Sequence, residues 1–307
     1  MAGIIREFRG RADCLEIMGL VARNPANSIH ALDMPYRLSS PSLDEPRGVG
    51  LWENEAGELI GFAVFQWPWQ TLDYGYAQGL ADSGLEQQIL AWAIERFPQL
   101  SKNYLTYEHP LLFVDAPQGD SAKISLLEMN GFKKHTWQTT HFVKSLAGPL
   151  PGASLPPGFS LRPVANAAEY VKIHQAAFES TSMTIEWRER VEKWPQYRPE
   201  LNVVAVAPDQ SVVAFCSGWL GRFDPAKLSG PDDTGLTGQI EPMGVHPDYR
   251  GKRLGRAVLE EVFKRMKAEG SGAVIVETDN FREEAQRLYQ AVGFQQTHLI
   301  YKYSREF

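Results

Sequence analysis

Residues 250–256 place four cationic side chains and two glycines within seven positions. Apolar residues recur every three or four positions from Leu254 onward, which predicts a helix that begins there. A glycine-containing loop at a helix start directs unpaired backbone N–H groups one way, and the helix dipole adds partial positive charge. Cations are unfavourable at that end of a helix, so their crowding indicates a bound anion such as a pyrophosphate. The predicted binding residues are Arg250, Gly251, Lys252, Arg253, Leu254, Gly255 and Arg256.

The elements around this loop are predicted to alternate between strand and helix. Gln239–Val245 has the pattern of a strand that leads into the loop, and Gly270 ends the helix that follows. A short strand at Ala273–Val276 and a second helix come next. The loop has neither the Gly-Lys-Ser/Thr ending of a Walker A motif nor a Gly-x-Gly-x-x-Gly fingerprint.

The first half of the chain repeats this plan. Leu111–Val114 matches Ala273–Val276, and the sequence Asn-Gly-Phe at 130–132 matches Val-Gly-Phe at 292–294. Residues 147–158 are rich in proline and glycine, which suits a linker. The sequence therefore predicts two α/β domains, at 1–146 and 159–307, on either side of a linker at 147–158.

The C-terminal domain resembles the GNAT superfamily of N-acetyltransferases. Residues 245–255 are similar to that family's coenzyme A pyrophosphate loop, Gln/Arg-x-x-Gly-x-Gly/Ala, with Arg250 first and Gly255 last. Arg253 stands where the first glycine usually lies. Further marks of the family are Asn280 after the next strand, then Ala285, Leu288 and Tyr289 on the next helix.

The resemblance implies two tandem GNAT-like domains, each a mixed, mostly antiparallel sheet flanked by helices. It also implies acetyl-CoA as co-substrate, no metal, and direct attack by an amine in a ternary complex. The strand at 239–245 would part from its neighbour, and the backbone of Met243, Gly244 and Val245 would bind the pantetheine arm, with Asn280 close by. The Val245 N–H would polarise the thioester oxygen.

Two proton transfers remain to be assigned. Glu241 is a candidate base because it lies on the strand that lines the cleft, and a structural carboxylate is the alternative. Tyr289 matches the family's usual acid for the departing thiolate, and a packing aromatic is the alternative. In the N-terminal domain, Leu127 takes the place that matches Tyr289 and the basic loop is missing, so we expect a degenerate copy.

Composition narrows the partners. A formal net charge of −6 and a pI near 5.7 argue against nucleic acid as a ligand. No stretch is long and apolar enough for a signal peptide or a membrane span, so we expect a cytoplasmic protein, monomeric or homodimeric. We expect a small amine as acceptor. Two alternatives stay open: acetylation of protein or peptide amines, and a non-catalytic acyl-CoA sensor.

Overall fold

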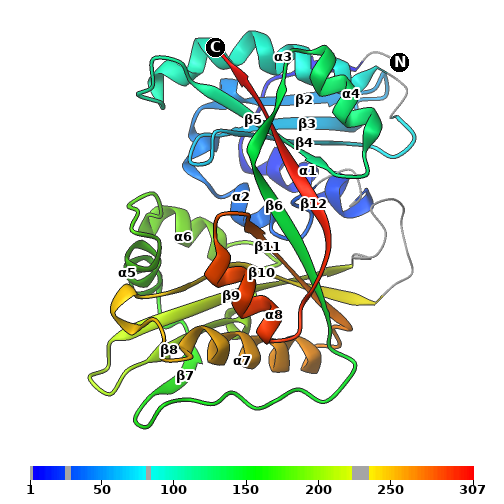
Figure 1. Ribbon diagram of the computed structural model, residues 1–307. Helices are drawn as coiled ribbons and strands as arrows, with labels where there is room; N and C mark the ends of the chain where they lie inside the picture. The colour runs from blue at the N-terminus through cyan, green and yellow to red at the C-terminus, as the bar shows by residue number, and fades with distance from the viewer. Residues whose placement is uncertain (1–2, 25–28, 81–83, 223–234) are drawn as a thin grey trace. The chain divides into compact units, whose positions relative to one another are not determined.

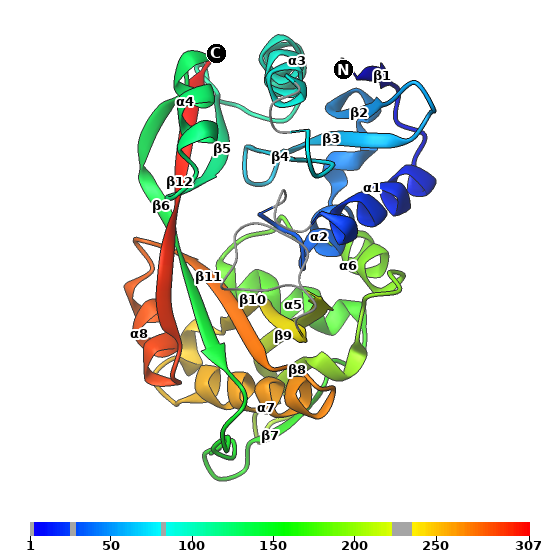
Figure 2. The same cartoon turned by 90° about the vertical axis from the view of Figure 1, so that its right-hand side faces the viewer.

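A computed structural model describes residues 3–24, 29–80, 84–222 and 235–307, drawn in Figures 1 and 2. Contacts among these residues form two compact units. Unit 1 comprises the described residues up to Thr140 together with 298–307, and unit 2 comprises the described residues between 141 and 297. The units thus divide the chain differently from the sequence pattern, which assigns residues 298–307 to the C-terminal domain. No helix of the described residues is long and apolar enough to cross a membrane.

The sheet of unit 1 has the strand order β1-β2-β3-β4-β5-β12-β6. Neighbouring strands from β1 to β4, and the pair β5 and β12, run antiparallel, whereas β4 and β5 run parallel. The strands of this unit are β1 (Ile4–Arg6), β2 (Val49–Glu53), β3 (Leu59–Gln66), β4 (Thr71–Tyr76), β5 (Leu111–Pro117), β6 (Lys133–Ser145) and β12 (Gln295–Glu306). Its helices are α1 (Arg11–Arg23), α2 (Met34–Arg37), α3 (Leu85–Leu100) and α4 (Ser121–Met129).

Side chains alternate between the two faces of this sheet, as strand geometry requires. On β3, Ala63 and Phe65 face the hydrophobic core under α3, where Phe65 stacks on Trp92 at 5.1 Å between ring centroids. Gln66, the next residue, points to the opposite face, where its side chain bonds to Ser40 and to the backbone of Arg37. Unit 1 therefore has an apolar face under α3, and its opposite face, on the side of α2, includes buried polar side chains.

The sheet of unit 2 has the order β6-β11-β10-β9-β8-β7. β7 to β10 pair antiparallel, and β10 and β11 pair parallel, so both units have the mixed, mostly antiparallel sheet that the sequence predicts. The further strands of this unit are β7 (Ser160–Pro163), β8 (Asn202–Val206), β9 (Val212–Arg222), β10 (Leu236–Val245) and β11 (Ala273–Asp279). Its helices are α5 (Ala167–Phe178), α6 (Ile185–Glu192), α7 (Leu254–Ala268) and α8 (Glu283–Ala291).

The two faces of β9 separate the helices of unit 2. Phe215 faces α5, where it meets the ring of Tyr170 at 5.3 Å. Gly218 faces α7, and a Cβ on this glycine would come within 2.6 Å of the Met266 side chain. By alternation Ser217 and Trp219 lie on the α5 face, and Cys216 lies in the core that α7 covers. Residues 215, 217 and 219 thus form a row beneath α5.

Strands β6 and β12 each contribute residues to both units (Figure 1). β12 pairs with β5 from Ile300 to Glu306, within unit 1, while its first residues belong to unit 2. Residues 147–158 contain no helix or strand and connect β6 to β7. The C-terminal segment of the chain is therefore an inner strand of the N-terminal unit.

Candidate active site

The site of unit 2 begins where β10 parts from β11. Their paired residues run from Thr237 and Ala273 to Ile240 and Val276, and pairing stops there. β10 continues against β9 as far as Val245, after a register shift between Ile240 and Met243. Residues 243–245 therefore have one edge paired with β9 and one edge that faces the gap between the parted strands.

The open edge presents backbone groups of Met243 and Val245. The N–H of His246 donates to Val213 on β9, so His246 and Gly244 direct their backbone groups to the paired side. Alternation turns the N–H and C=O groups of Met243 and Val245 toward the gap. Gly244 itself is required by packing, since a Cβ there would lie 2.7 Å from Cβ of Ala177 on α5. The gap is thus lined by amide groups suited to an extended ligand that carries amides of its own.

Beyond the gap, a loop leads to the N-terminus of α7. Among the described residues, the backbone N–H groups from Gly251 to Arg256 have no acceptor. Gly251 has φ +77°, and Arg253, immediately before α7, has φ 61° in the left-handed region. Arg253 thus adopts the conformation that glycine favours, which explains how it occupies a position where glycine is expected. The run of free N–H groups at a helix start is an anion site.

The four cationic side chains of this loop differ in their surroundings. The Arg250 guanidinium donates to the carbonyl of Ala177 at 3.1 Å. Lys252 lies over the Tyr249 ring, and Arg256 donates to Glu260 on the next turn of α7 at 2.7 Å. Arg253 is exposed and has no partner within the described part of the chain. Arg253 is therefore the cation that is most available to a phosphate.

Two predicted residues lie on the far side of the loop. Gly255 is buried at the second position of α7, where a Cβ would meet Leu288 on α8 at 3.2 Å and Val245 at 3.3 Å. Asn280 follows β11 directly and is exposed. Gly255 packs α7 against both α8 and the end of β10, which brings the free N–H groups of the loop next to the open edge.

The structure brings Glu241 and Tyr289 together. Tyr289 is buried on α8, in the α7-side core, with its ring near Phe142 and Phe294. Burial is the largest cause that raises the pKa of its hydroxyl, and the negative charge of Glu241 raises it further. This hydroxyl has no hydrogen-bond partner among the described residues. A protonated phenol and a half-buried carboxylate therefore lie within electrostatic range of each other at the gap.

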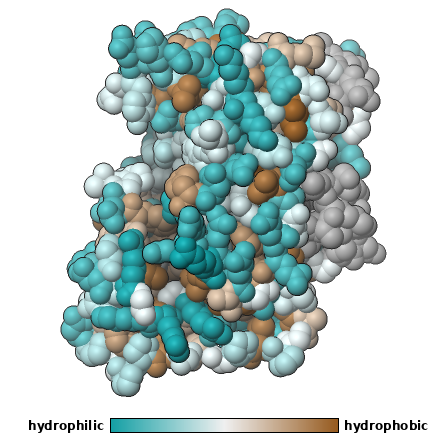
Figure 3. All heavy atoms as spheres, viewed as in Figure 1, coloured by the Kyte–Doolittle hydropathy of each residue, from teal (hydrophilic) through white to brown (hydrophobic). Residues whose placement is uncertain are grey.

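The surface over this region is hollowed. In the lower half of Figure 3, hydrophilic side chains surround a recess in which hydrophobic side chains are exposed. The recess lies over the part of unit 2 where β10 leads into α7, as a comparison with Figure 1 shows. A ligand with a charged end and a less polar arm matches this distribution.

Comparison with known proteins decides the family. The model of the acetyltransferase (GNAT) family matches residues 167–294, from α5 to the end of the segment after α8. The C-terminal half of this chain belongs to the GNAT acetyltransferase family. The matched range includes every predicted site residue, from Glu241 to Tyr289.

Curated relatives match about half of the chain. A mycothiol acetyltransferase of Paenarthrobacter aurescens is 32% identical over 155 residues, which are 47% of this chain and 45% of the relative. One of Thermobispora bispora is 28% identical over 158 residues, 49% of this chain and 51% of the relative. The chain thus spans about half the length of the curated relatives that it matches.

Solved structures match the fold over nearly the whole chain. A GCN5-related N-acetyltransferase from Sphaerobacter thermophilus aligns with a TM-score of 0.64 at 20% identity, covering 99% of this chain and 95% of that one. A tandem GNAT protein from the clavulanic acid biosynthesis pathway aligns at 0.62 with 14% identity, covering 99% and 98%. The chain therefore has a tandem GNAT fold, of which unit 1 is the first copy.

Three residues that lie beside the gap are not among the predicted catalytic or cofactor-binding residues, although Trp219 could be considered from its sequence position as a wall of the acceptor site or a core tryptophan. The indole Nε1 of Trp219 donates to the Glu241 carbonyl at 2.7 Å. The hydroxyls of Tyr170 and Ser217 are buried without a hydrogen-bond partner. No motif marks any of the three, because their proximity depends on the register shift in β10 and on where α5 crosses the sheet.

Proposed function

We propose that this protein is an acetyl-CoA-dependent N-acetyltransferase that acetylates a primary amine of a small molecule. The proposal rests on one observation: the free N–H groups of residues 251–256 lie next to the open edge of β10. A pyrophosphate at the loop and a pantetheine arm along the edge would bring a thioester toward Glu241 and Tyr289. The match to the GNAT family, whose members use acetyl-CoA, supports this assignment of the two elements.

The residues divide the reaction into steps that the geometry supports. The Glu241 carboxylate accepts a proton from the acceptor ammonium, and the free amine then attacks the thioester carbonyl. The Val245 N–H, turned toward the gap, donates to the oxygen that becomes negative in the tetrahedral intermediate. The C–S bond then breaks, the Tyr289 hydroxyl donates its proton to the departing thiolate, and the second proton that the attacking nitrogen loses restores the phenol. Since burial and Glu241 raise the pKa of Tyr289, this hydroxyl is protonated at neutral pH.

The comparisons support a small acceptor. The curated relatives, which match about half of the chain, are named mycothiol acetyltransferases, that is, for a small molecule and not for a protein. Acylation of protein amines and a purely acyl-CoA-binding role are the competing outcomes of the test.

The test is thiol release from acetyl-CoA in the presence of single amines: amino sugars, amino acids, polyamines and aminoglycosides. We expect one class to stimulate release, and we expect Glu241→Gln to slow turnover on that amine by about a hundredfold, the usual contribution of a general base. Tight binding of acetyl-CoA with no thiol release for any amine would instead identify a sensor. Acetylation of peptides but of no small amine would identify a protein acetyltransferase.

A further inference from the structure

The backbone of Glu241 lies where β10 leaves both of its ladders. Pairing with β11 ends at Ile240, and the pairing with β9 shifts register between Ile240 and Met243. A bulge of this kind leaves backbone groups without their ladder partners, and a buried carbonyl then needs another donor. The next residue, Pro242, has no N–H, so it cannot anchor this segment by donating a hydrogen bond.

Trp219 supplies the donor. It is 2% exposed and pairs with Gln239 in the ladder, two positions before Glu241. Its ring lies on the α5 face of the sheet and its Nε1 donates to the Glu241 carbonyl at 2.7 Å. An indole has one donor and no acceptor, and a buried donor without a partner is costly. The bond therefore satisfies two groups that the bulge and the core would otherwise leave unpaired.

The position of this carbonyl matters because Glu241 lies within electrostatic range of two tyrosines, one on each face of the sheet. Burial is the main cause that raises the pKa of Tyr170 on α5 to about 12, and Glu241 adds to it. Glu241 also raises the pKa of Tyr289 on the α7 side. One carboxylate reaches groups on both faces only where the sheet has opened. A small rotation of the peptide between residues 241 and 242 would move the carboxylate out of that opening.

Tyr170 and Ser217 form a small polar lining next to Glu241. The Ser217 hydroxyl lies near enough to Tyr170 to lower the pKa of the phenol, although neither oxygen has a hydrogen-bond partner of normal geometry. Below them the Arg188 guanidinium stacks on the Tyr170 ring at 3.9 Å and donates to Asn202, so the ring cannot turn freely. The neighbours of the Glu241 carboxylate are therefore held in place. The orientation of the carboxylate toward them then depends on how the backbone of Glu241 is anchored.

We propose that Trp219 is a positioning residue of the acetyl transfer: its indole N–H holds the Glu241 carbonyl, and through it directs the carboxylate at the acceptor amine. The proposal rests on the proposed function, because it takes Glu241 as the base. A displacement of about 1 Å in a reacting group costs on the order of a hundredfold in rate, so loss of the anchor is expected to slow turnover about tenfold or more.

The experiment compares Trp219→Phe in two backgrounds, the wild type and Glu241→Gln. The probes are acetyl-CoA and the amine that gives the fastest thiol release in the panel above. In the wild type we expect kcat to fall about tenfold with KM for acetyl-CoA unchanged, since the pyrophosphate loop lies elsewhere. In Glu241→Gln we expect the same substitution to change kcat by less than about twofold, because a residue that acts through Glu241 has nothing left to position.

Trp194→Phe is the matched control, because Trp194 is equally buried in unit 2 but lies after α6 and outside β9 and β10. It should lower the melting temperature about as much as Trp219→Phe and leave kcat in place. Equal losses of kcat from Trp219→Phe in both backgrounds, or none in the wild type, would overturn the positioning role while Glu241 stays the base. Wild-type turnover in Glu241→Gln alone, or a wild type inactive on every amine, would refute the proposed function, and this inference with it.

Discussion

The helices α3 and α7 begin at equivalent points of the two units, and their first turns carry opposite charge. α7 starts Leu254-Gly255, has no acidic residue in its first turn, and follows a run of free N–H groups. α3 starts Leu85-Glu86, and the Glu86 carboxylate accepts hydrogen bonds from Tyr74 and Tyr76 on β4. A carboxylate at a helix N-terminus takes the interaction that a phosphate would otherwise gain. An acidic residue in the second position of α3 therefore disfavours a phosphate at this helix start.

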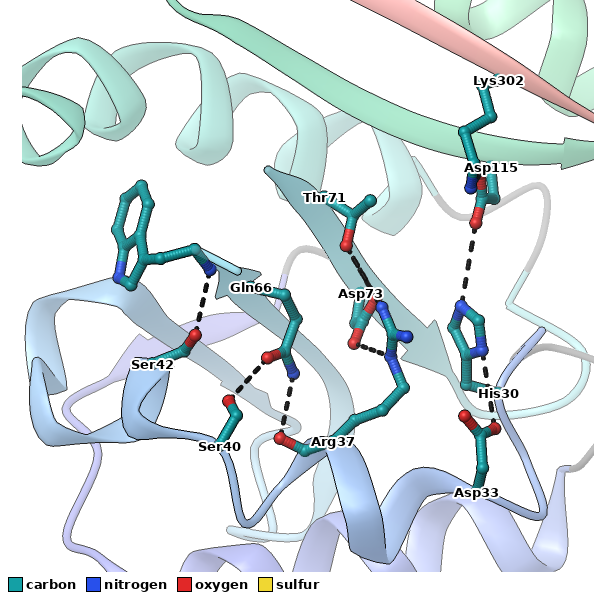
Figure 4. Close-up of polar contacts among 11 residues, drawn as sticks. His30, Asp33, Arg37, Ser40, Ser42, Gln66, Thr71, Asp73, Asp115 and Lys302 are labelled. Atoms are coloured by element: carbon teal, nitrogen blue, oxygen red, sulfur yellow. Dashed lines mark hydrogen bonds and ion pairs between the residues drawn. The ribbon is translucent and has the colours of Figure 1, made fainter. Parts of the chain in front are cut away.

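The places where neighbouring strands diverge also differ between the two units in the charged side chains that they contain. In unit 1 the register joins β4 to β5 at Thr71 and Phe113, and the strands then diverge, with Asp73 on one and Asp115 on the other. Three buried cations fill the space beside these carboxylates, as Figure 4 shows. Arg37 pairs with Asp73, Lys302 pairs with Asp115 at 2.6 Å, and His30 lies between Asp115 and Asp33. In unit 1 ion pairs thus occupy the place that corresponds to the gap between β10 and β11 in unit 2.

His30 takes part in this network as a cation at neutral pH. Burial and the charge of Arg37 oppose its ionisation, but Asp33 and Asp115 raise its pKa to about 10. The carboxyl pKa values of Asp33 and Asp115 are held below their usual range, despite burial, chiefly by His30 and by Lys302 respectively. Three cations then face three anions, which lets the charges stay buried without a net excess.

The strongest test of the contrast transfers the acid of unit 1 to unit 2. Gly255→Glu should weaken acetyl-CoA binding by about a hundredfold or more, because its carboxylate would occupy the N-terminus of α7 and repel the pyrophosphate. Gly255→Ala is the control for crowding against Leu288 and Val245, and it should cost much less. Isothermal titration should give one site per wild-type chain and none in Gly255→Glu. Two equivalent sites in the wild type would show that unit 1 also binds acetyl-CoA.

Tyr289→Phe should lower kcat by about a hundredfold, the usual contribution of a general acid, with acetyl-CoA affinity unchanged. Solvent can protonate a thiolate in part, so the loss can be as small as about tenfold. The matching control is Tyr303→Phe in unit 1, where a buried hydroxyl bonds to Glu128 and touches no substrate. It should change the melting temperature but not turnover. Undiminished kcat in Tyr289→Phe, with chemistry rate-limiting, would make Tyr289 a packing residue.

Removal of a single cation from residues 250–256 should weaken acetyl-CoA binding less than Gly255→Glu does. Arg253→Ala and Arg250→Ala should each raise the dissociation constant of acetyl-CoA about tenfold, as expected for one charge-assisted contact of about 1.5 kcal/mol. Arg253→Gly should separate charge from backbone, since glycine accepts the left-handed conformation of this position. Lys102→Ala, an exposed cation of unit 1, should leave the affinity unchanged. Equal affinities in all four variants would mean that the pyrophosphate binds elsewhere.

A substitution in the ion-pair network of unit 1 should have the smallest effect on the affinity for acetyl-CoA. His30→Gln should destabilise the protein by about 3 kcal/mol, the cost of breaking a buried pair, and leave acetyl-CoA affinity unchanged. The folded-state pKa of about 10 lies above the ordinary value of 6.5, so the stabilisation is complete below about pH 6.5 and is lost as the pH rises to 10.

Melting temperatures of wild type and His30→Gln should therefore differ most near pH 6 and converge near pH 10. His109→Gln is the control, because this side chain is 66% exposed. A difference that is independent of pH would show that His30 contributes by packing alone.

The sequence predicted what local patterns encode. The glycines and cations of residues 250–256 located the loop before α7, and apolar spacing located α7 itself, which extends from Leu254 to Ala268. The tandem GNAT fold is confirmed, and the roles of Glu241 and Tyr289 stay proposals. Arg253 departs from the family pattern in residue type alone, because its φ of 61° preserves the backbone path.

Relations between distant residues could not be predicted. His30, Asp73, Asp115 and Lys302 belong to four separate segments, and each alone has the pattern of an ordinary surface charge. The anchor from Trp219 depends on a register shift that leaves no mark in the residue pattern. Similarly, the alternation of residues 298–306 predicts a strand but does not say which sheet the strand joins. The domain boundary drawn from proline and glycine could therefore not anticipate that this strand belongs to unit 1.

The position of β12 makes the folding of unit 1 depend on the synthesis of unit 2. In the sheet of unit 1 this strand lies between β5 and β6, yet the ribosome synthesises it after the whole of unit 2. The first unit must therefore wait, with the inner edges of β5 and β6 unpaired, until nearly all of the second has emerged. A fragment of this chain that ends within residues 147–158 would lack β12. The edges of β5 and β6 would then stay unpaired, and exposed strand edges favour aggregation. Two units joined in this way depend on one chain segment, so neither can complete its sheet without the other.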